Sequence, residues 1–86
     1  MEIELFADAI KDYKYWQKTG NKSIQKKISQ LFASIKATPY EGLGKPEPLK
    51  YDLSGKWSRR ITQEHRLIYD IKKDVIRVFS LRGHYN

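Results

Sequence analysis

The chain of 86 residues contains no cysteine, so it can form neither a disulfide framework nor a metal site held by thiolates. It also lacks an apolar run of the roughly 20 residues that a membrane-spanning helix requires. Its first residues, Met1-Glu2-Ile3-Glu4, are acidic and lack the basic and apolar regions of a secretory leader. We therefore expect a cytoplasmic protein with no membrane partner, whose residues 1–86 form a single domain around one modest core.

Motifs that hold metals or nucleotides are absent as well. Acidic residues are scarce between positions 17 and 50, where only Glu41 and Glu47 occur. No glycine-rich phosphate loop, no zinc-ligand spacing and no carboxylate cluster suited to Mg²⁺ can be found. Because a metal-dependent nuclease normally gathers several acidic ligands, we expect neither a metal nor another cofactor.

Basic residues, in contrast, are abundant. Seventeen Lys and Arg residues against ten Asp and Glu give a net charge of +7. Residues 1–16 carry four acidic and two basic side chains, a net charge of −2, so the remaining chain carries +9. A body this basic indicates a polyanionic partner, most often nucleic acid, although charge also serves solubility alone.

Two helices are expected in the first half of the chain, after a short alternating strand at residues 1–5. The apolar positions of the first helix are Phe6, Ala9, Ile10, Tyr13 and Trp16. Those of the second helix are Ile24, Ile28, Leu31, Phe32 and Ile35. Residues 19–21 separate the two helices, Asn21 or Ser23 can cap the second, and Thr38-Pro39 ends it.

Strands are expected in the second half. Residues 40–50 contain two glycines and two prolines, which indicates an irregular loop. Residues 56–62, 65–71 and 75–82 alternate with period two and are predicted strands, joined by turns at 63–64 and 72–74. This order predicts an α+β fold in which two N-terminal helices pack on one face of a mainly antiparallel, four-stranded sheet. The last strand has apolar residues on both sides, so we expect it to be central, and the uncovered sheet face suits an RNA strand.

Glu47 is the first candidate for chemistry. Two prolines flank it and hold its backbone extended, and Lys45 and Lys50 lie close in sequence. A carboxylate in basic surroundings suits a proton acceptor. The alternative is a solvated loop glutamate neutralised by these lysines.

Three arginines follow on the predicted strands. Alternation places Arg60 with Ser58 and Thr62, and it places Arg59 with Trp57 and Ile61. Arg66 begins the next strand. Arginine suits phosphate because its planar fork donates in pairs and stays charged. The alternative is a set of surface salt bridges with Glu64 and Asp70.

The chain closes on Arg82-Gly83-His84-Tyr85-Asn86. The imidazole of His84 can exchange a proton near neutral pH, and Tyr85 can donate a hydrogen bond or stack on a base. The alternative is a frayed polar tail. His65 is interpreted as structural, because Leu67 and Tyr69 at period two point toward the core.

Four blocks of this sequence, with a closing His84-Tyr85 pair, resemble the YoeB toxins within the RelE-like superfamily. They are Asp12-Tyr13-Lys14-Tyr15-Trp16, Gly44-Lys45-Pro46-Glu47-Pro48-Leu49-Lys50, Leu53-Ser54-Gly55-Lys56-Trp57-Ser58-Arg59-Arg60-Ile61 and Glu64-His65-Arg66-Leu67-Ile68-Tyr69. The resemblance implies a RelE-like, microbial-ribonuclease-like fold and the toxin of a type II toxin–antitoxin system. It further implies an endoribonuclease that cleaves mRNA in the ribosomal A site, a YefM-like antitoxin, and operator DNA bound only by the toxin–antitoxin pair. The family also includes homodimers.

The resemblance also assigns roles to residues. Glu47 matches the family's general base, Arg66 the arginine that stabilises the phosphate, and His84 the general acid. Tyr85 matches the adjacent functional tyrosine, expected to position the reacting groups. Further substrate-binding candidates are Lys50, Arg60, Arg59 and Lys45. The family's His-Tyr pair usually ends the chain, whereas Asn86 follows here, so a role for the terminal carboxylate is in doubt.

The mechanism expected from these roles is a metal-independent transesterification on the RNA's own 2′-hydroxyl. Two other classes compete with it. A basic open sheet with Trp57, Tyr69 and Tyr85 can bind RNA or the ribosome without cutting. A DNA-binding repressor acting alone is disfavoured, because the second helix uses its apolar stripe for packing and shows no recognition-helix signature.

Overall fold

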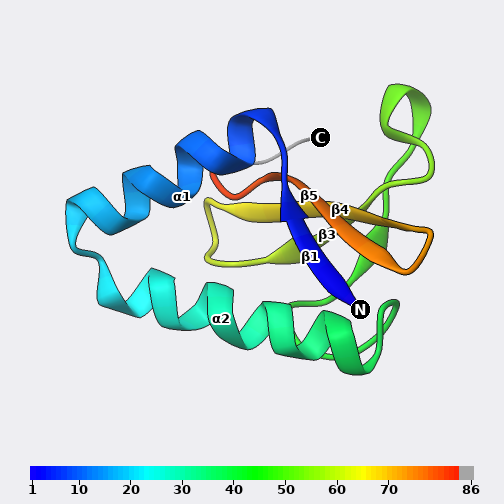
Figure 1. Cartoon of the computed structure of the whole chain (residues 1–86), viewed down its shortest axis with the longest axis horizontal. Helices are drawn as coiled ribbons and strands as arrows, with labels where there is room; N and C mark the ends of the chain where they lie inside the picture. Colours follow the sequence, from blue (N-terminus) through cyan, green and yellow to red (C-terminus); the bar gives the residue numbers. More distant parts are fainter. Residues whose placement is uncertain (84–86) are drawn as a thin grey trace.

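The computed structural model describes residues 1–83, so His84 and Tyr85 lie outside the described part of the chain (Figure 1). The elements in chain order are β1 (Glu2–Leu5), α1 (Ala7–Thr19), α2 (Lys22–Ala37), β2 (Glu47–Pro48), the 3₁₀ turn η1 (Tyr51–Leu53), β3 (Trp57–Arg60), β4 (Arg66–Lys72) and β5 (Val75–Ser80). No helix within residues 1–83 is long and apolar enough to cross a membrane.

The two helices meet where the sequence predicted a break. α1 ends at Gly20, whose φ of +69° is a left-handed conformation that glycine adopts without strain. α2 begins directly afterwards, and the Asn21 side chain caps it by accepting a hydrogen bond from the Ile24 amide at 3.1 Å. Asn21, one of the two predicted caps, is therefore the residue that performs this role.

The sheet has five strands in the order β1-β5-β4-β3-β2, one more than predicted. The additional strand is β2, where Glu47 pairs with Ser58 and Pro48 with Trp57. Two residues are too few to show an alternating pattern, and flanking prolines normally indicate a loop. β1 runs parallel to β5 and the other pairings are antiparallel, which confirms the predicted α+β class.

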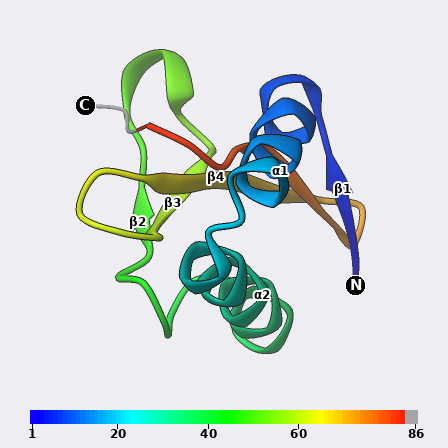
Figure 2. The same ribbon diagram turned by 90° about the vertical axis from the view of Figure 1, so that its left-hand side faces the viewer.

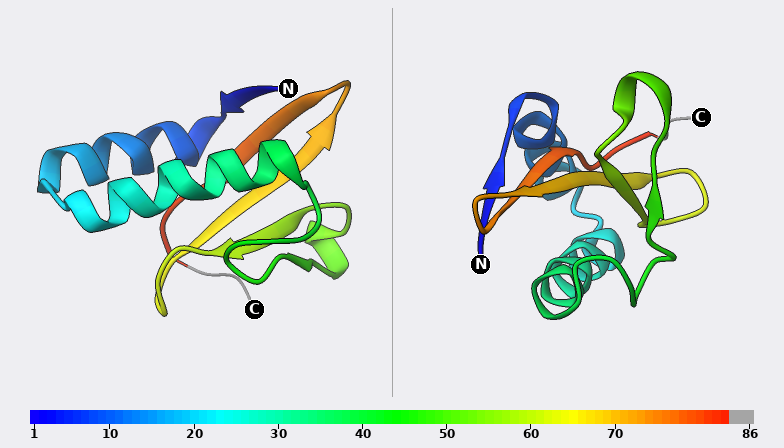
Figure 3. Two further views of the ribbon diagram at one scale, coloured as in Figure 1. Left: turned by 90° about the horizontal axis from the view of Figure 1, so that it is seen from below. Right: turned by 90° about the vertical axis from the view of Figure 1, so that its right-hand side faces the viewer.

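One face of the sheet and both helices build the core. The buried cluster takes Ala9 and Trp16 from α1 and four residues from α2, and it joins them to Leu67, Tyr69 and Val78 of the sheet. Cross-strand pairing shows that these sheet residues share one face. Figures 2 and 3 show α1 and α2 beside one another against the strands, with β5 between β1 and β4, which confirms that the last strand is central.

The opposite face of the sheet carries the polar side chains of Ser58, Arg60 and Arg66, together with the buried Ile68. Pairing of Ser58 with Ile68 and of Arg60 with Arg66 places all four on this face. Farther along β4, Asp70 accepts a hydrogen bond from Nε of Arg77 at 2.7 Å, and this hydrogen bond raises the pKa of the arginine. Asp70 therefore pairs with Arg77. The surface salt bridge between Arg66 and Asp70, which was the alternative considered from the sequence, does not form.

Candidate functional site

Glu47 lies on the edge strand β2, and backbone hydrogen bonds hold this strand on both sides. The Arg60 amide donates to the Gly44 carbonyl at 2.6 Å, and the Leu49 amide donates to the Lys56 carbonyl at 2.9 Å. Between these two ties, Glu47 pairs with Ser58 and its side chain is exposed. The main chain is thus fixed while the carboxylate remains open to a ligand.

Gly44 allows this loop to approach the body of the protein. Its φ is +84°, and a Cβ there would lie 2.8 Å from Cδ2 of Leu31 and 3.0 Å from the Arg60 carbonyl oxygen. The loop therefore passes directly between α2 and β3. Only glycine fits this position without displacing backbone. Gly44 therefore allows the segment that leads into β2 to pack closely against β3.

Arg66 lies on the same sheet face as Glu47. It pairs with Arg60, two residues along β3 from Ser58, which pairs with Glu47. β2 and β4 flank β3, so the two Cα atoms are two strand spacings apart, about 10 Å across the sheet, and offset by about 7 Å along it. One phosphate between the strands is within the combined reach of a glutamate and an arginine side chain. The half-buried Arg66 guanidinium donates to the Thr62 carbonyl at 3.1 Å, which anchors its base.

Gly83, the last described residue, is bound to the backbone of Arg66. The Arg66 amide donates to the Gly83 carbonyl at 2.7 Å. Gly83 is the residue immediately before His84, which lies outside the described residues together with Tyr85. The chain therefore delivers its last described residue to the backbone of the predicted phosphate-binding arginine.

The other predicted basic residues, Lys50, Arg60 and Lys45, are all exposed. Arg60 shares the face of Glu47 and Arg66. Arg60 and Lys45 both line a groove between α2 and the end of β3.

Arg59 does not belong to the exposed site. Its side chain is completely buried, and all five of its N–H donors are used. They bind the Tyr69 and Ser34 hydroxyls and the carbonyls of Leu43, Thr38 and Glu41, at 2.7–3.2 Å. The prediction that Arg59 binds substrate is wrong, because a guanidinium with no free donor and no exposure cannot reach RNA.

Arg59 instead joins the sheet to the loop before Glu47. The Tyr69 hydroxyl accepts from its Nε and donates to the Pro39 carbonyl, and burial raises the pKa of this tyrosine. Alternation had already placed Arg59 on the same side of the strand as the apolar Trp57 and Ile61. That placement was the available signal that its role is structural.

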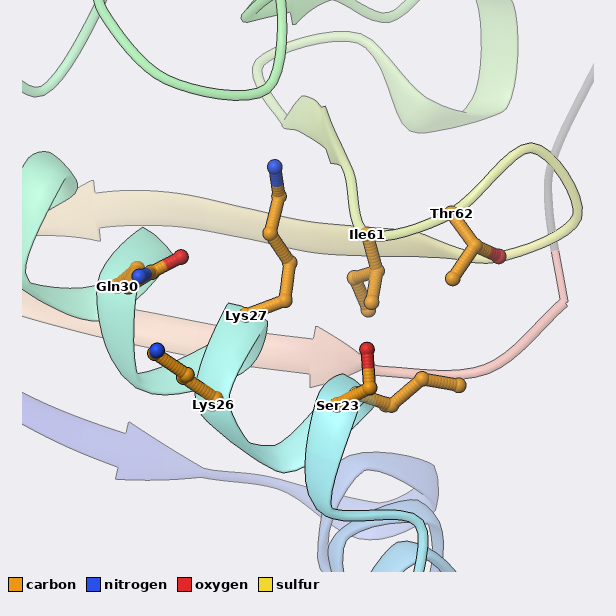
Figure 4. Close-up of a pocket in the computed structure, with 7 residues that line it drawn as sticks. Ser23, Lys26, Lys27, Gln30, Ile61 and Thr62 are labelled. Atoms are coloured by element: carbon orange, nitrogen blue, oxygen red, sulfur yellow. The ribbon is translucent and has the colours of Figure 1, made fainter.

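A basic groove runs along the N-terminal half of α2. Two adjoining hollows of about 320 and 400 Å³ share Lys27, Ile61 and Thr62 as lining residues. The full lining is Ser23, Ile24, Lys26, Lys27, Gln30, Gly44, Lys45, Arg60, Ile61, Thr62 and Gln63, with no carboxylate among them. Figure 4 shows Lys27 extending from α2 toward the strand layer that carries Ile61. We call these residues the α2 groove; no local sequence pattern connects them.

Metal-binding side chains do not gather in the described chain. Within residues 1–83, no three His, Cys, Asp or Glu residues lie close enough together to hold an ion. Among the described residues, this face therefore offers an exposed carboxylate and several cations.

Comparisons with known proteins agree on one family. A family model described as "YoeB-like toxin of bacterial type II toxin-antitoxin system" matches residues 6–85. Toxin YoeB of Escherichia coli K12 is 55% identical over 74 residues, which cover 86% of this chain and 87% of that protein. Toxin YoeB of Streptomyces coelicolor is 44% identical and covers 99% of this chain and 100% of its own.

Solved structures give the same result. A YoeB/ParE toxin from Agrobacterium tumefaciens superposes with a TM-score of 0.94 at 42% identity, covering 99% of this chain and 100% of the other. The toxin in a YoeB–YefM complex from Staphylococcus aureus has a TM-score of 0.90 at 44% identity, covering 99% and 98%. A YoeB dimer from the same organism has a TM-score of 0.90 at 43% identity, with the same coverage.

Proposed function

Because this chain belongs to the YoeB-like toxins of bacterial type II toxin–antitoxin systems, we propose that it is a ribosome-dependent endoribonuclease. It cleaves mRNA in the ribosomal A site and thereby stops translation in the cytoplasm. The observation that carries this proposal is the shared sheet face of Glu47 and Arg66, together with the hydrogen bond from the Arg66 amide to the Gly83 carbonyl. This arrangement offers a proton acceptor and a phosphate ligand, and it holds the residue that precedes the proposed proton donor beside Arg66.

The reaction is a transesterification. The Glu47 carboxylate accepts the proton of a 2′-hydroxyl, and that oxygen attacks the adjacent phosphorus. Arg66, with Lys50 and Arg60, stabilises the charge that develops on the phosphoryl oxygens. The bond from phosphorus to the 5′-oxygen breaks, His84 protonates the departing oxygen, and Tyr85 positions the reacting groups. The products are a 2′,3′-cyclic phosphate and a free 5′-hydroxyl, and no step is assigned to a metal.

The ribosome supplies orientation. Holding two reacting groups in line can contribute about 7–11 kcal/mol to lowering a barrier. Glu47 is solvent-exposed on an edge strand, so the protein by itself does little to hold the reacting groups of an RNA in line. We therefore expect slow cleavage of free RNA and fast cleavage of mRNA in the A site.

The nucleophile can be tested directly. An mRNA with a 2′-deoxy nucleotide at the cut position should resist cleavage on translating ribosomes, because the attacking oxygen is missing. Primer extension measures the discrete ends that only an enzyme leaves, so it also separates cleavage from mere blocking of translation. Equal cutting of the ribo and deoxy substrates would show that another group is the nucleophile.

The partners of this chain are proposed from the same family. Staphylococcus aureus YoeB has been solved both in complex with YefM and as a dimer. We assign this chain a YefM-like antitoxin and a homodimeric state, with operator DNA bound only by the toxin–antitoxin complex.

The α2 groove gives a place for RNA beyond the cut site. It carries Lys26, Lys27, Lys45 and Arg60 without a lining carboxylate, and its hydroxyl and amide groups can hydrogen bond to a sugar–phosphate backbone. Replacing Lys26 and Lys27 together with glutamine should weaken binding of a non-cleavable, single-stranded RNA. The slope of log affinity against log salt should fall by about 1.4, because each lost phosphate contact removes about 0.7.

The matched control for this experiment replaces Lys36 and Lys72, which are exposed lysines that do not line the groove. It removes the same charge, so it reports the effect of net charge alone. Fluorescence anisotropy between 50 and 200 mM salt measures both variants. If the two pairs weaken binding equally, the groove has no RNA-binding role; if only antitoxin affinity changes, its ligand is the antitoxin.

A further inference from the structure

We propose that His65, together with Asp12 and Trp16 of α1, positions the C-terminal segment that carries His84 and Tyr85. The proposal depends on the cleavage mechanism above for its effect on rate, but the anchor itself can be measured without reference to cleavage. It assigns a role to the Asp12–Trp16 block, which the catalytic roles leave unexplained.

His65 binds the residue before His84. Its Nδ1 accepts a hydrogen bond from the Gly83 amide at 2.9 Å, while the next residue, Arg66, donates its amide to the Gly83 carbonyl at 2.7 Å. His65 and Arg66, two successive residues where β4 begins, thus bind both backbone polar groups of Gly83. The separation between the Arg66 backbone and the start of the His84 segment is fixed by these two bonds.

The His65 ring is held in turn by α1. It packs edge-on against the Trp16 indole, with ring centroids 4.9 Å apart. Trp16 is buried and donates its Nε1–H to the Leu81 carbonyl at 2.8 Å. The same side chain therefore orients His65 and binds the chain two residues before Gly83.

Asp12 completes the anchor. Its Oδ2 accepts a hydrogen bond from the Leu81 amide at 2.9 Å and one from the Ser80 hydroxyl at 3.4 Å. Both polar backbone groups of Leu81 are thus bound by side chains one helical turn apart on α1. In addition, the Arg82 guanidinium lies 3.7 Å from the Tyr15 ring centroid. Contacts from α1 and from the start of β4 thus hold four consecutive residues, 80–83, at the end of β5. Both contacting segments are more than 15 residues away in the sequence.

Such a connection would not be needed for a free tail. A terminal segment without a task normally frays, since each ordered residue costs about 1–2 kcal/mol of conformational entropy. A catalytic acid, in contrast, must reach the leaving oxygen within hydrogen-bond distance, and a shift of about 1 Å can cost about 10²-fold in rate. The anchor restricts the backbone immediately before His84, and His84 is the residue that must be positioned most accurately for the proposed reaction.

Two substitutions of His65 separate the effect of its hydrogen bond to Gly83 from the effect of its ring contact with Trp16. Asparagine places its amide oxygen near the position of Nδ1 and can accept from Gly83, whereas glutamine reaches the position of Nε2 and leaves Gly83 unpaired. Both lose the contact with Trp16. We expect His65→Gln to lower kcat for mRNA cleavage on programmed ribosomes by about 10–100-fold at unchanged KM, and His65→Asn to retain most of it.

A stability control excludes a general effect of weakened folding. Asn21→Ala removes the cap of α2, which costs about 1 kcal/mol, and it touches no residue of the anchor. Its kcat should equal that of the wild type. Equal losses of kcat in His65→Gln and His65→Asn, or a similar loss in Asn21→Ala, would overturn the positioning role.

The hydrogen-exchange rate of the Gly83 amide measures directly whether His65 binds this amide. The amide should be protected in the wild type and in His65→Asn, and exchange freely in His65→Gln. If Gly83 is protected equally in all three proteins, the anchor is wrong regardless of activity. If protection follows the prediction but Glu47→Gln still cleaves at the wild-type rate, the anchor stands and the cleavage mechanism fails.

Discussion

Replacing Glu47 with glutamine should lower the rate of mRNA cleavage by about 10²–10⁴-fold, the contribution of a positioned general base. Glutamine has nearly the same shape as glutamate but cannot accept the 2′-hydroxyl proton. The side chain is exposed and the strand is held by backbone hydrogen bonds, so the free energy of unfolding should change by less than about 0.5 kcal/mol. Single-turnover cleavage on programmed ribosomes and urea denaturation measure the two quantities.

Glu41→Gln is the matched control for this change. Glu41 is exposed, lies in the same loop and contributes its backbone carbonyl, not its carboxylate, to the bond with Arg59. The same loss of charge at this position should leave cleavage unchanged. A Glu47→Gln protein that cleaves as fast as Glu41→Gln would remove Glu47 from the mechanism.

Replacing Arg59 with lysine should produce the largest loss of stability, roughly 3–5 kcal/mol. An ammonium group has three donors and a single point of contact, whereas the guanidinium here serves five acceptors from the end of α2, the following loop and β4. At least two acceptors would lose their partner in the interior. Native domains are stable by only about 5–15 kcal/mol, so the variant should unfold at a much lower urea concentration.

The neighbouring arginine provides the comparison. Arg60 is exposed, and Arg60→Lys should change the free energy of unfolding by less than about 0.5 kcal/mol. It should weaken RNA binding instead, since its predicted task is to contact phosphate. Equal stability of the two variants in urea would contradict the structural role of Arg59.

The two adjacent arginines show where sequence reasoning reached its limit. Their types and alternation indicated that they point to opposite sides of a strand, which is correct. The suitability of arginine for phosphate nevertheless made both of them substrate-binding candidates. Arginine is so commonly a phosphate ligand that a fully buried one, bound to carbonyls, is hard to recognise without knowing what surrounds it.

β2 was missed for a related reason. Its two residues carry no periodicity, and prolines on both sides of Glu47 indicate a loop. The strand forms because Gly44 and Leu49 are tied to β3 by their backbones, and these bonds depend on tertiary contact. The position of Glu47 on the same sheet face as Arg66 is a consequence of this pairing.

The amino-acid sequence by itself determined the helices, the strands with a regular period, the basic character and the family of this protein. These features are local or compositional: apolar residues at helical or alternating spacing, a cap at Asn21 or Ser23, and the ordered family blocks. Tertiary structure alone decided that Arg59 is internal, that Glu47 sits on a strand, and that α1 and His65 hold Gly83. Each of these joins residues far apart in the chain, and hydrogen bonds over such separations follow from packing, which no local pattern records.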